Sequence, residues 1–133
     1  MTKERNLDVF KDIQNQDGNL VLIIGRQYEN ADKQVIDELE EAGCNVWIKH
    51  FPDIEEIYNL SDCYVFPTIN KKACIEMPLS VMEAMACNLP VITTKFGALP
   101  RVFDQTDGLF FVDENKDIYK IKCICLLTFK SIK

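Results

Sequence analysis

The sequence predicts an α/β protein with an open, doubly wound parallel sheet (Rossmann-like), in which helices cover both faces to give three α/β/α layers. Short apolar runs, typical of strands buried on both faces, alternate with amphipathic segments of about a dozen residues. Segments of that kind join parallel strands through right-handed crossovers. The 133 residues, 47% of them hydrophobic and 27% charged, suit a single domain with a packed core.

The N-terminal part of the sequence contains a helix, a strand and a second helix. Apolar residues recur about one helical turn apart over residues 3–14, which predicts an amphipathic helix that ends before an Asp-Gly turn. The continuous apolar run over residues 19–24 predicts a buried strand. We expect a helix over residues 31–42, with Asn30 as its N-cap and Gly43 as the residue that ends it.

The middle of the sequence repeats this alternation. A second strand is expected over residues 44–49, followed by a short helix over residues 54–60 with Asp53 as its N-cap. A third strand is expected over residues 63–66. A polar stretch then predicts a loop over residues 67–76.

The C-terminal part supplies two more helices and two more strands. A helix is expected over residues 78–87, with Pro78 in its first turn, where a helix accepts proline. A strand over residues 90–93 and a short turn and helix over residues 97–103 follow. The last strand is expected over residues 109–112, directly after a glycine.

Charge and cysteine usage exclude several classes of protein. Fifteen Lys and Arg against 21 Asp and Glu give a net charge of −6, which disfavours nucleic-acid binding through a broad basic face. No apolar run approaches the roughly 18 residues of a spanning helix, and the charged start does not resemble a secretory signal. The six cysteines are scattered, and a single histidine without a C-x-x-C motif or a histidine cluster disfavours a zinc site. We therefore expect a cytoplasmic protein with free thiols and no metal site.

The end of the chain differs from the rest in charge. No acidic residue follows Asp117, whereas four lysines do. We divide the chain into a single domain over residues 1–118 and a basic, apolar tail over residues 119–133. Such a tail can contact a membrane surface or a partner. The simpler interpretation, which we favour, is a surface helix or a ragged end of the reading frame.

Four sequence blocks narrow the choice of family. They are Ile-Tyr-Asn-Leu-Ser-Asp-Cys-Tyr-Val-Phe-Pro-Thr (57–68), Met-Pro-Leu-Ser-Val-Met-Glu-Ala-Met-Ala (77–86), Gly-Ala-Leu-Pro (97–100) and Asp-Gly-Leu-Phe-Phe-Val (107–112). In this order and spacing they resemble the C-terminal, donor-binding half of the GT-B glycosyltransferases, in the retaining "group 1" branch. The resemblance covers about residues 19–117 and is strongest over residues 57–112.

The resemblance implies a nucleotide-sugar-binding domain of a retaining glycosyltransferase of the hexosyltransferase type, active in glycan biosynthesis. Its donor is a nucleotide-diphosphate-sugar and its acceptor a glycan, a lipid or a small molecule. The donor is a substrate, so no resident cofactor is implied, and no metal is required.

The donor diphosphate needs a site that neutralises its charge. In doubly wound sheets ligands bind beyond the carboxyl ends of the strands, where helices begin. The first amides of a helix lack intrahelical partners and favour anions. Pro78 has no N–H, so the helix after it offers the amides of Leu79, Ser80 and Val81. By resemblance, Glu83 on the same helix binds the two ribose hydroxyls of the donor.

Relatives commonly carry a second glutamate, eight positions before the first, that contacts the transferred sugar. That position is Ile75 here, and the nearest carboxylate is Glu76. We assign the catalytic, sugar-contacting role to Glu76, on the expectation that residues 67–77 form a flexible loop. The alternative is a solvated loop carboxylate and an altered sugar site. The glycine-rich turn of relatives is also replaced, by Glu76-Met77-Pro78.

Three basic residues complete the implied donor site. Arg5-Asn6 resembles a Lys-Gly pair of relatives, so Arg5 stands in for the cation that binds the diphosphate, with Lys3 as the less favoured choice. Both are otherwise ordinary surface charges. Arg26 follows the strand over residues 19–24, near the place where relatives bind the nucleotide base.

We find no counterpart here of the strand that precedes the Lys-Gly segment in relatives, or of their acceptor-binding N-terminal domain. We therefore expect a partial enzyme, without glycosyl transfer by itself, whose partner is a separate N-terminal half or a second copy. The alternative is a non-catalytic α/β remnant or interaction module. A receiver-like domain is disfavoured, because the strand over residues 19–24 ends in Gly-Arg rather than in aspartates.

Overall fold

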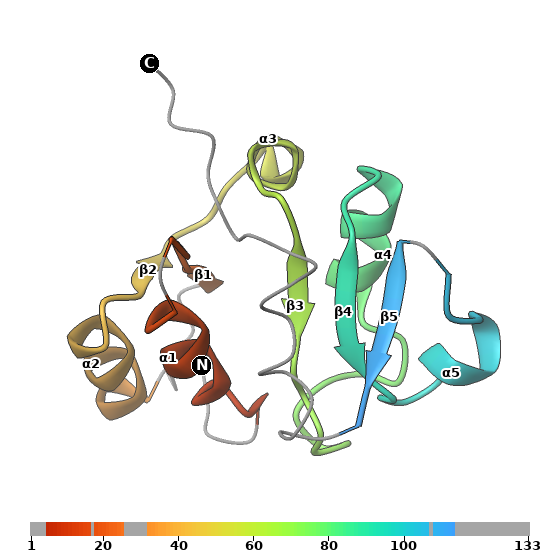
Figure 1. Cartoon of the computed structure of the whole chain (residues 1–133), viewed down its shortest axis with the longest axis horizontal. Helices are drawn as coiled ribbons and strands as arrows, with labels where there is room; N and C mark the ends of the chain where they lie inside the picture. The colour runs from red at the N-terminus through yellow and green to blue at the C-terminus, as the bar shows by residue number, and fades with distance from the viewer. Residues whose placement is uncertain (1–4, 17, 26–31, 107, 114–133) are drawn as a thin grey trace.

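Helices and strands alternate along the chain in the order that the sequence predicts (Figure 1). The computed structural model describes residues 5–16, 18–25, 32–106 and 108–113. The helices in these ranges are α1 (Val9–Gln14), α2 (Lys33–Glu41), α3 (Ile54–Leu60), α4 (Leu79–Ala86) and α5 (Leu99–Val102). The strands are β1 (Leu22–Gly25), β2 (Asn45–Ile48), β3 (Tyr64–Phe66), β4 (Val91–Thr94) and β5 (Leu109–Val112).

The strands pair in parallel, which confirms the predicted α/β class. They form two sheets rather than the one continuous sheet expected: β1 pairs with β2, and β3, β4 and β5 form a second sheet in that order. In the second sheet Val65 is in register with Ile92, and Ile92 with Phe110. The carboxyl ends of β3, β4 and β5 therefore lie at the same end of the sheet, where the loop to α4 begins.

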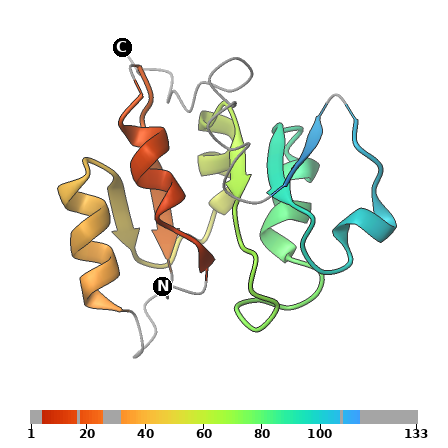
Figure 2. The same ribbon diagram turned by 60° about the horizontal axis from the view of Figure 1, so that its bottom comes forward.

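Helices cover both faces of the strands, as the three-layer prediction requires. Successive strand residues point to opposite faces, and the buried residues divide accordingly: Val65 and Ile92 belong to one core cluster, Phe66 and Val91 to the other. The first cluster lies under α1 and α2, and the second under α3, α4 and α5. In Figure 2, α1 and α2 lie beside β1 and β2, whereas α4 and α5 lie beside the three-stranded sheet.

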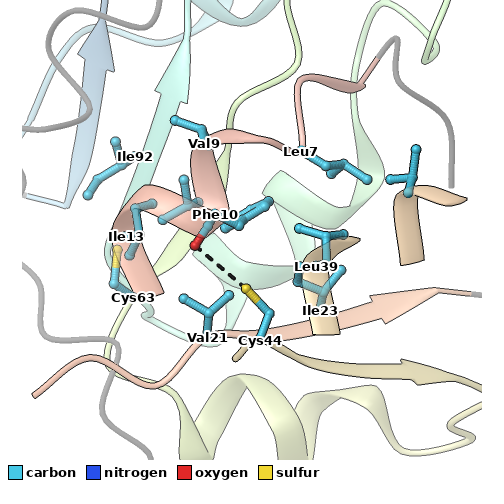
Figure 3. Close-up of a cluster of buried hydrophobic side chains, with 12 residues drawn as sticks. Leu7, Val9, Phe10, Ile13, Val21, Ile23, Leu39, Cys44, Cys63 and Ile92 are labelled. Carbon is cyan, nitrogen blue, oxygen red and sulfur yellow. Dashed lines mark hydrogen bonds between the residues drawn. The ribbon is translucent and has the colours of Figure 1, made fainter. Parts of the chain in front are cut away.

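Helix α1 connects the two sheets through the first core cluster. Phe10 and Ile13 of α1 are buried with Ile23 of β1 and Val65 of β3. Figure 3 shows Phe10 and Ile13 in one cluster with Ile23 and Ile92, and the Cys44 thiol donates to the Phe10 carbonyl at 3.6 Å. One continuous apolar core therefore spans both sheets.

The break between the sheets falls at a specific place in the topology. Doubly wound sheets commonly have the strand order 3-2-1-4-5-6, in which the first strand lies between the second and the fourth. The order β2-β1 followed by β3-β4-β5 matches this arrangement without its central strand. Within the described ranges, the edges of β1 and β3 that face the break therefore have no strand paired to them.

Three helices begin differently from the sequence prediction. Helix α1 begins at Val9 rather than at residue 3, because Asn6 has a φ of 58°, in the left-handed region that a helix cannot include. The N-cap of α2 is Asp32, whose carboxylate accepts a hydrogen bond from the Gln34 amide at 3.1 Å. The expected cap, Asn30, lies outside the described residues. Helix α4 begins at Leu79, with Pro78 as the preceding N-cap residue.

Two further local expectations have mixed outcomes. Asp53 is the N-cap residue of α3 as predicted, but its side chain makes no capping hydrogen bond. Gly43 ends α2 as predicted: its φ is 91°, which favours glycine, and its amide donates to the Glu40 carbonyl at 2.9 Å.

Among the described residues, no helix is long and apolar enough to cross a membrane. The tail over residues 119–133 lies outside the described residues.

We expect the protein to self-associate as its concentration rises. Open strand edges are templates for pairing with another chain, and the edges of β1 and β3 at the break are of this kind within the described ranges. Sedimentation velocity over a concentration series should show a mass that increases with concentration. A single monomeric species throughout the series would count against open edges in the full chain.

We also expect the free energy of unfolding to fall as the pH is raised above about 9. Burial raises the pKa of the Cys44 thiol to about 11. Burial, and then the neighbouring Tyr64 and Glu83 groups, raises the pKa of Tyr58. Both groups keep their protons in the folded state at a pH where the unfolded chain loses them. Stability is therefore retained below the unfolded pKa values and lost as the pH rises through the folded ones.

Thermal melts between pH 8 and pH 11 would measure this loss. The Cys44→Ala variant should show a shallower decline than the parent, because it lacks one of the buried acids. An unfolding temperature independent of pH across this range would contradict the burial of these groups.

Candidate functional site

The N-terminus of α4 lies beyond the carboxyl end of β3, where a ligand is expected in this fold. Pro78 is buried and extended, with φ −66° and ψ 115°, and directs the chain into the helix. The Val81 amide donates to the Pro78 carbonyl at 3.2 Å. Of the three predicted amides, those of Leu79 and Ser80 therefore remain without an acceptor among the described residues. They can bind an anion that approaches the helix end.

Glu83 lies on α4 about one turn beyond these amides, and α3 supplies its hydrogen-bond partner. The Tyr58 hydroxyl donates to Glu83 Oε2 at 3.1 Å, and its oxygen lies 3.4 Å from the Ser80 carbonyl oxygen. The Tyr58 ring is buried whereas Glu83 is exposed. The carboxylate is therefore held from the protein side and open on the solvent side.

Tyr64 of β3 lies next to this pair. Its ring meets that of Tyr58 edge to face, with centroids 5.8 Å apart and an interplanar angle of 83°. Burial raises the pKa of Tyr64. A hydrogen bond with the Ser80 side chain and the positive charge of Arg5 lower this pKa, whereas the negative charge of Glu83 raises it. Groups from two separate segments, α4 and the segment that carries Arg5, thus act on one hydroxyl.

The structure therefore places Ser80 and Glu83 of the predicted site beside the two tyrosines, and the charge of Arg5, a third predicted residue, acts on Tyr64. Sequence reasoning missed the two tyrosines that join them. Both fall within the block over residues 57–68, but nothing in a single sequence shows that Tyr58 and Tyr64 point toward α4. We call these five residues the Tyr58–Tyr64 cluster.

A hydrogen bond attaches the segment that carries Arg5 to the loop after β3. Asn6 Nδ2 donates to the Pro67 carbonyl at 3.1 Å, while Asn6 itself has a left-handed φ of 58°. Glycine takes such a conformation most readily and asparagine is the next choice, so Asn6 suits the place of the glycine in the Lys-Gly pair of relatives. Arg5 is exposed. Lys3 and Arg26 lie outside the described residues.

Glu76 lies on the loop between β3 and α4, and its contacts are with the turn before α5. Its carbonyl oxygen accepts a hydrogen bond from the Ala98 amide at 2.9 Å. Its carboxylate forms an ion pair with Arg101, with Oε2 and Nη2 3.1 Å apart. Side chains of both residues are mostly exposed, at 77% and 69%. The end of the loop is therefore attached to a neighbouring turn, a feature absent from the sequence prediction.

A second group of side chains lies at the end of β2 and directly after it. The rings of Trp47 and Phe51 stack with centroids 5.8 Å apart, and Lys49 Nζ lies 5.2 Å and 4.7 Å from the two centroids. Trp47 belongs to β2, and Lys49 and Phe51 follow it at the ligand side of the fold. Among the described residues, no group of three or more His, Cys, Asp or Glu side chains is placed to hold a metal ion.

The parallel strands, the helices on both faces and the open N-terminus of α4 define a Rossmann-like α/β domain. The family model for glycosyl transferases group 1 matches residues 5–128 of the chain, and the chain belongs to this family. A search of curated proteins found no match. Family membership supports a glycosyltransferase-like function, and it agrees with the resemblance seen in the sequence blocks.

Proposed function

We propose that the domain binds a nucleotide-diphosphate-sugar and serves as the donor-binding part of a retaining glycosyltransferase. The observation that carries this proposal is the hydrogen bond from Tyr58 to Glu83 beside the first amides of α4, together with the positive charge of Arg5 that acts on the neighbouring Tyr64. This arrangement offers a cation, free amides and a carboxylate within one site. A nucleoside diphosphate requires these three kinds of group.

The diphosphate lies at the start of α4. The amides of Leu79 and Ser80 donate to its oxygens, and the dipole of this eight-residue helix favours the negative charge. Arg5, whose positive charge acts on Tyr64, supplies the cation. No metal ion is needed in this proposal, because amides and a guanidinium meet the charge of the diphosphate.

The ribose lies against Glu83. An ionised carboxylate accepts hydrogen bonds from two neighbouring hydroxyls, and hydrogen bonds to charged groups are among the stronger ones in proteins. Tyr58 fixes one carboxylate oxygen through its hydroxyl, 3.1 Å away. The side chain is thus oriented before the ligand arrives, which lowers the entropic cost of binding.

The transferred sugar lies toward Glu76, the second carboxylate on the loop between β3 and α4. Glu76 is exposed and accepts hydrogen bonds from sugar hydroxyls through the oxygen that Arg101 does not use. In this proposal Glu83 determines nucleotide binding and Glu76 determines the additional affinity for the sugar. The two carboxylates therefore have separable effects.

A calorimetric screen of UDP, GDP and ADP, each alone and as its sugar conjugate, tests this proposal. We expect the purified chain to bind one nucleoside diphosphate in preference to the others and to bind its sugar conjugate more tightly. The Glu40→Gln variant, which removes an exposed carboxylate on α2, serves as a matched control and should bind like the parent. Failure of the folded chain to bind any of these nucleotides would contradict the proposal.

A further inference from the structure

The turn before α5 approaches the loop that carries Glu76 unusually closely. A Cβ atom at Gly97 would lie 2.1 Å from the Glu76 carbonyl oxygen and 2.9 Å from its carbonyl carbon. Both atoms belong to the backbone and cannot rotate away. Gly97 also has a φ of 53°, in the region where glycine is favoured. Any other residue at this position forces the turn and the loop apart.

Two polar contacts act across the same junction. The Ala98 amide donates to the Glu76 carbonyl at 2.9 Å, which fixes the backbone of Glu76. The Arg101 guanidinium donates to Glu76 Oε2 at 3.1 Å, which orients the carboxylate. Backbone and side chain of Glu76 are therefore both held from one short segment.

The turn itself is anchored in the protein core. Phe96 is 3% exposed and Leu99 is fully buried, and both belong to the core cluster under α3, α4 and α5. The Phe96 ring also packs edge to face against Phe66 of β3, with centroids 5.5 Å apart. A segment with buried residues on both sides of Gly97 can hold an exposed loop in place.

We propose that the turn over residues 96–101 positions Glu76 for the transferred sugar. This inference rests on the proposed function, since it concerns the sugar end of the same site. Glu76 stands one residue later than the corresponding glutamate of relatives, and the contact with Gly97, Ala98 and Arg101 determines where its carboxylate lies. Arg101 occupies Oε2 and leaves Oε1 for a sugar hydroxyl. Gly97 and Arg101 are positioning residues for Glu76.

The test compares two glycine variants in the full chain. Gly97→Ala separates the turn from Glu76, whereas Gly108→Ala places a methyl group where nothing lies within 4 Å. Calorimetry gives the dissociation constants of the nucleoside diphosphate and of its sugar conjugate for each variant. In Gly97→Ala we expect the extra affinity due to the sugar to fall roughly tenfold, the lower end of the range for a lost hydrogen bond to a charged group. Gly108→Ala should keep the affinity ratio of the parent.

A second variant keeps the test decisive where Gly97→Ala fails to fold. Arg101→Gln removes only the contact with the exposed carboxylate and leaves the backbone contacts in place. It should reduce the affinity ratio by a smaller factor, and Arg101→Lys should restore part of it. An unchanged ratio in these variants would overturn the inference, as would an equal loss of affinity for the nucleotide and for its sugar conjugate.

The outcomes also separate this inference from the proposed function. Absence of nucleotide binding by the parent would contradict the proposed function, and the inference would fall with it. If the parent binds the nucleotide and its sugar conjugate equally well, nucleotide binding stands, whereas the contribution of Glu76 to sugar affinity and its positioning by the turn are both overturned.

Discussion

Replacement of Glu83 by glutamine should weaken nucleoside diphosphate binding by roughly ten- to a hundredfold. The carboxylate accepts hydrogen bonds from both ribose hydroxyls in the proposed complex, and such bonds to a charged group contribute about 1.5–3 kcal/mol. Glutamine keeps the shape of the side chain and an oxygen for the Tyr58 hydroxyl, so the local fold is preserved. Isothermal titration calorimetry on parent and variant measures the difference directly.

Three controls accompany this measurement. The 2′-deoxy nucleotide should lose much less affinity in Glu83→Gln, because one partner hydroxyl is already missing. Glu76→Gln should leave nucleoside diphosphate binding nearly unchanged and affect only the sugar conjugate. Glu40→Gln removes an exposed carboxylate elsewhere and should have no effect. If Glu83→Gln binds the nucleotide as the parent does, the role assigned to Glu83 is wrong, although the fold remains.

Replacement of Ile13 by alanine should reduce the free energy of unfolding by about 2–5 kcal/mol, the cost of removing a buried isoleucine side chain down to the β-carbon. Ile13 is 3% exposed and belongs to the core cluster that spans both sheets. Domains of this size have a total stability of about 5–15 kcal/mol, so a large share would be lost. Chemical denaturation, monitored by circular dichroism, provides the measurement.

The matched control is Val102→Ala on α5, where the side chain is 58% exposed. Substitutions of exposed residues usually change stability by less than about 0.5 kcal/mol. This variant should therefore unfold at nearly the same denaturant concentration as the parent. A cost below about 1 kcal/mol for Ile13→Ala would mean that α1 does not hold the two sheets together as the buried cluster implies.

The order and type of the elements were predictable because they depend on local patterns. The apolar runs of β3 and β5 and the N-cap residue of α3 are visible in short windows of sequence, and these elements lie within a residue of the predicted bounds. The end of α2 was equally clear from Gly43, since a glycine in that place commonly ends a helix. Parallel pairing followed from the lengths of the connections.

Features that depend on contacts distant in sequence were not predictable. No local pattern encodes the break between β1 and β3, and only the resemblance, in which one strand of relatives has no counterpart here, points to it. The start of α1 was misplaced because the apolar period continues into a segment where Asn6 adopts a left-handed conformation. Asp32 was overlooked as a cap because Asn30, two residues earlier, is an equally good capping residue by type.

The candidate site shows the same division. Glu83 and the start of α4 came from sequence blocks and from the general rule that helix ends bind anions. The hydrogen bond from Tyr58 to Glu83 and the contact between Gly97 and Glu76 join residues about 20 to 25 positions apart, and they depend on how α3 and α5 pack. A single sequence contains no signal for such pairs.

The most direct test of the proposed donor site is an amide NMR titration of the chain with the nucleoside diphosphate that calorimetry selects. The account predicts the largest saturable shifts at the amides of Leu79 and Ser80, smaller shifts at Arg5 and Glu83, and none on α2, which contributes no residue to the Tyr58–Tyr64 cluster. Saturable shifts elsewhere, with Leu79 and Ser80 unchanged at full occupancy, would contradict it.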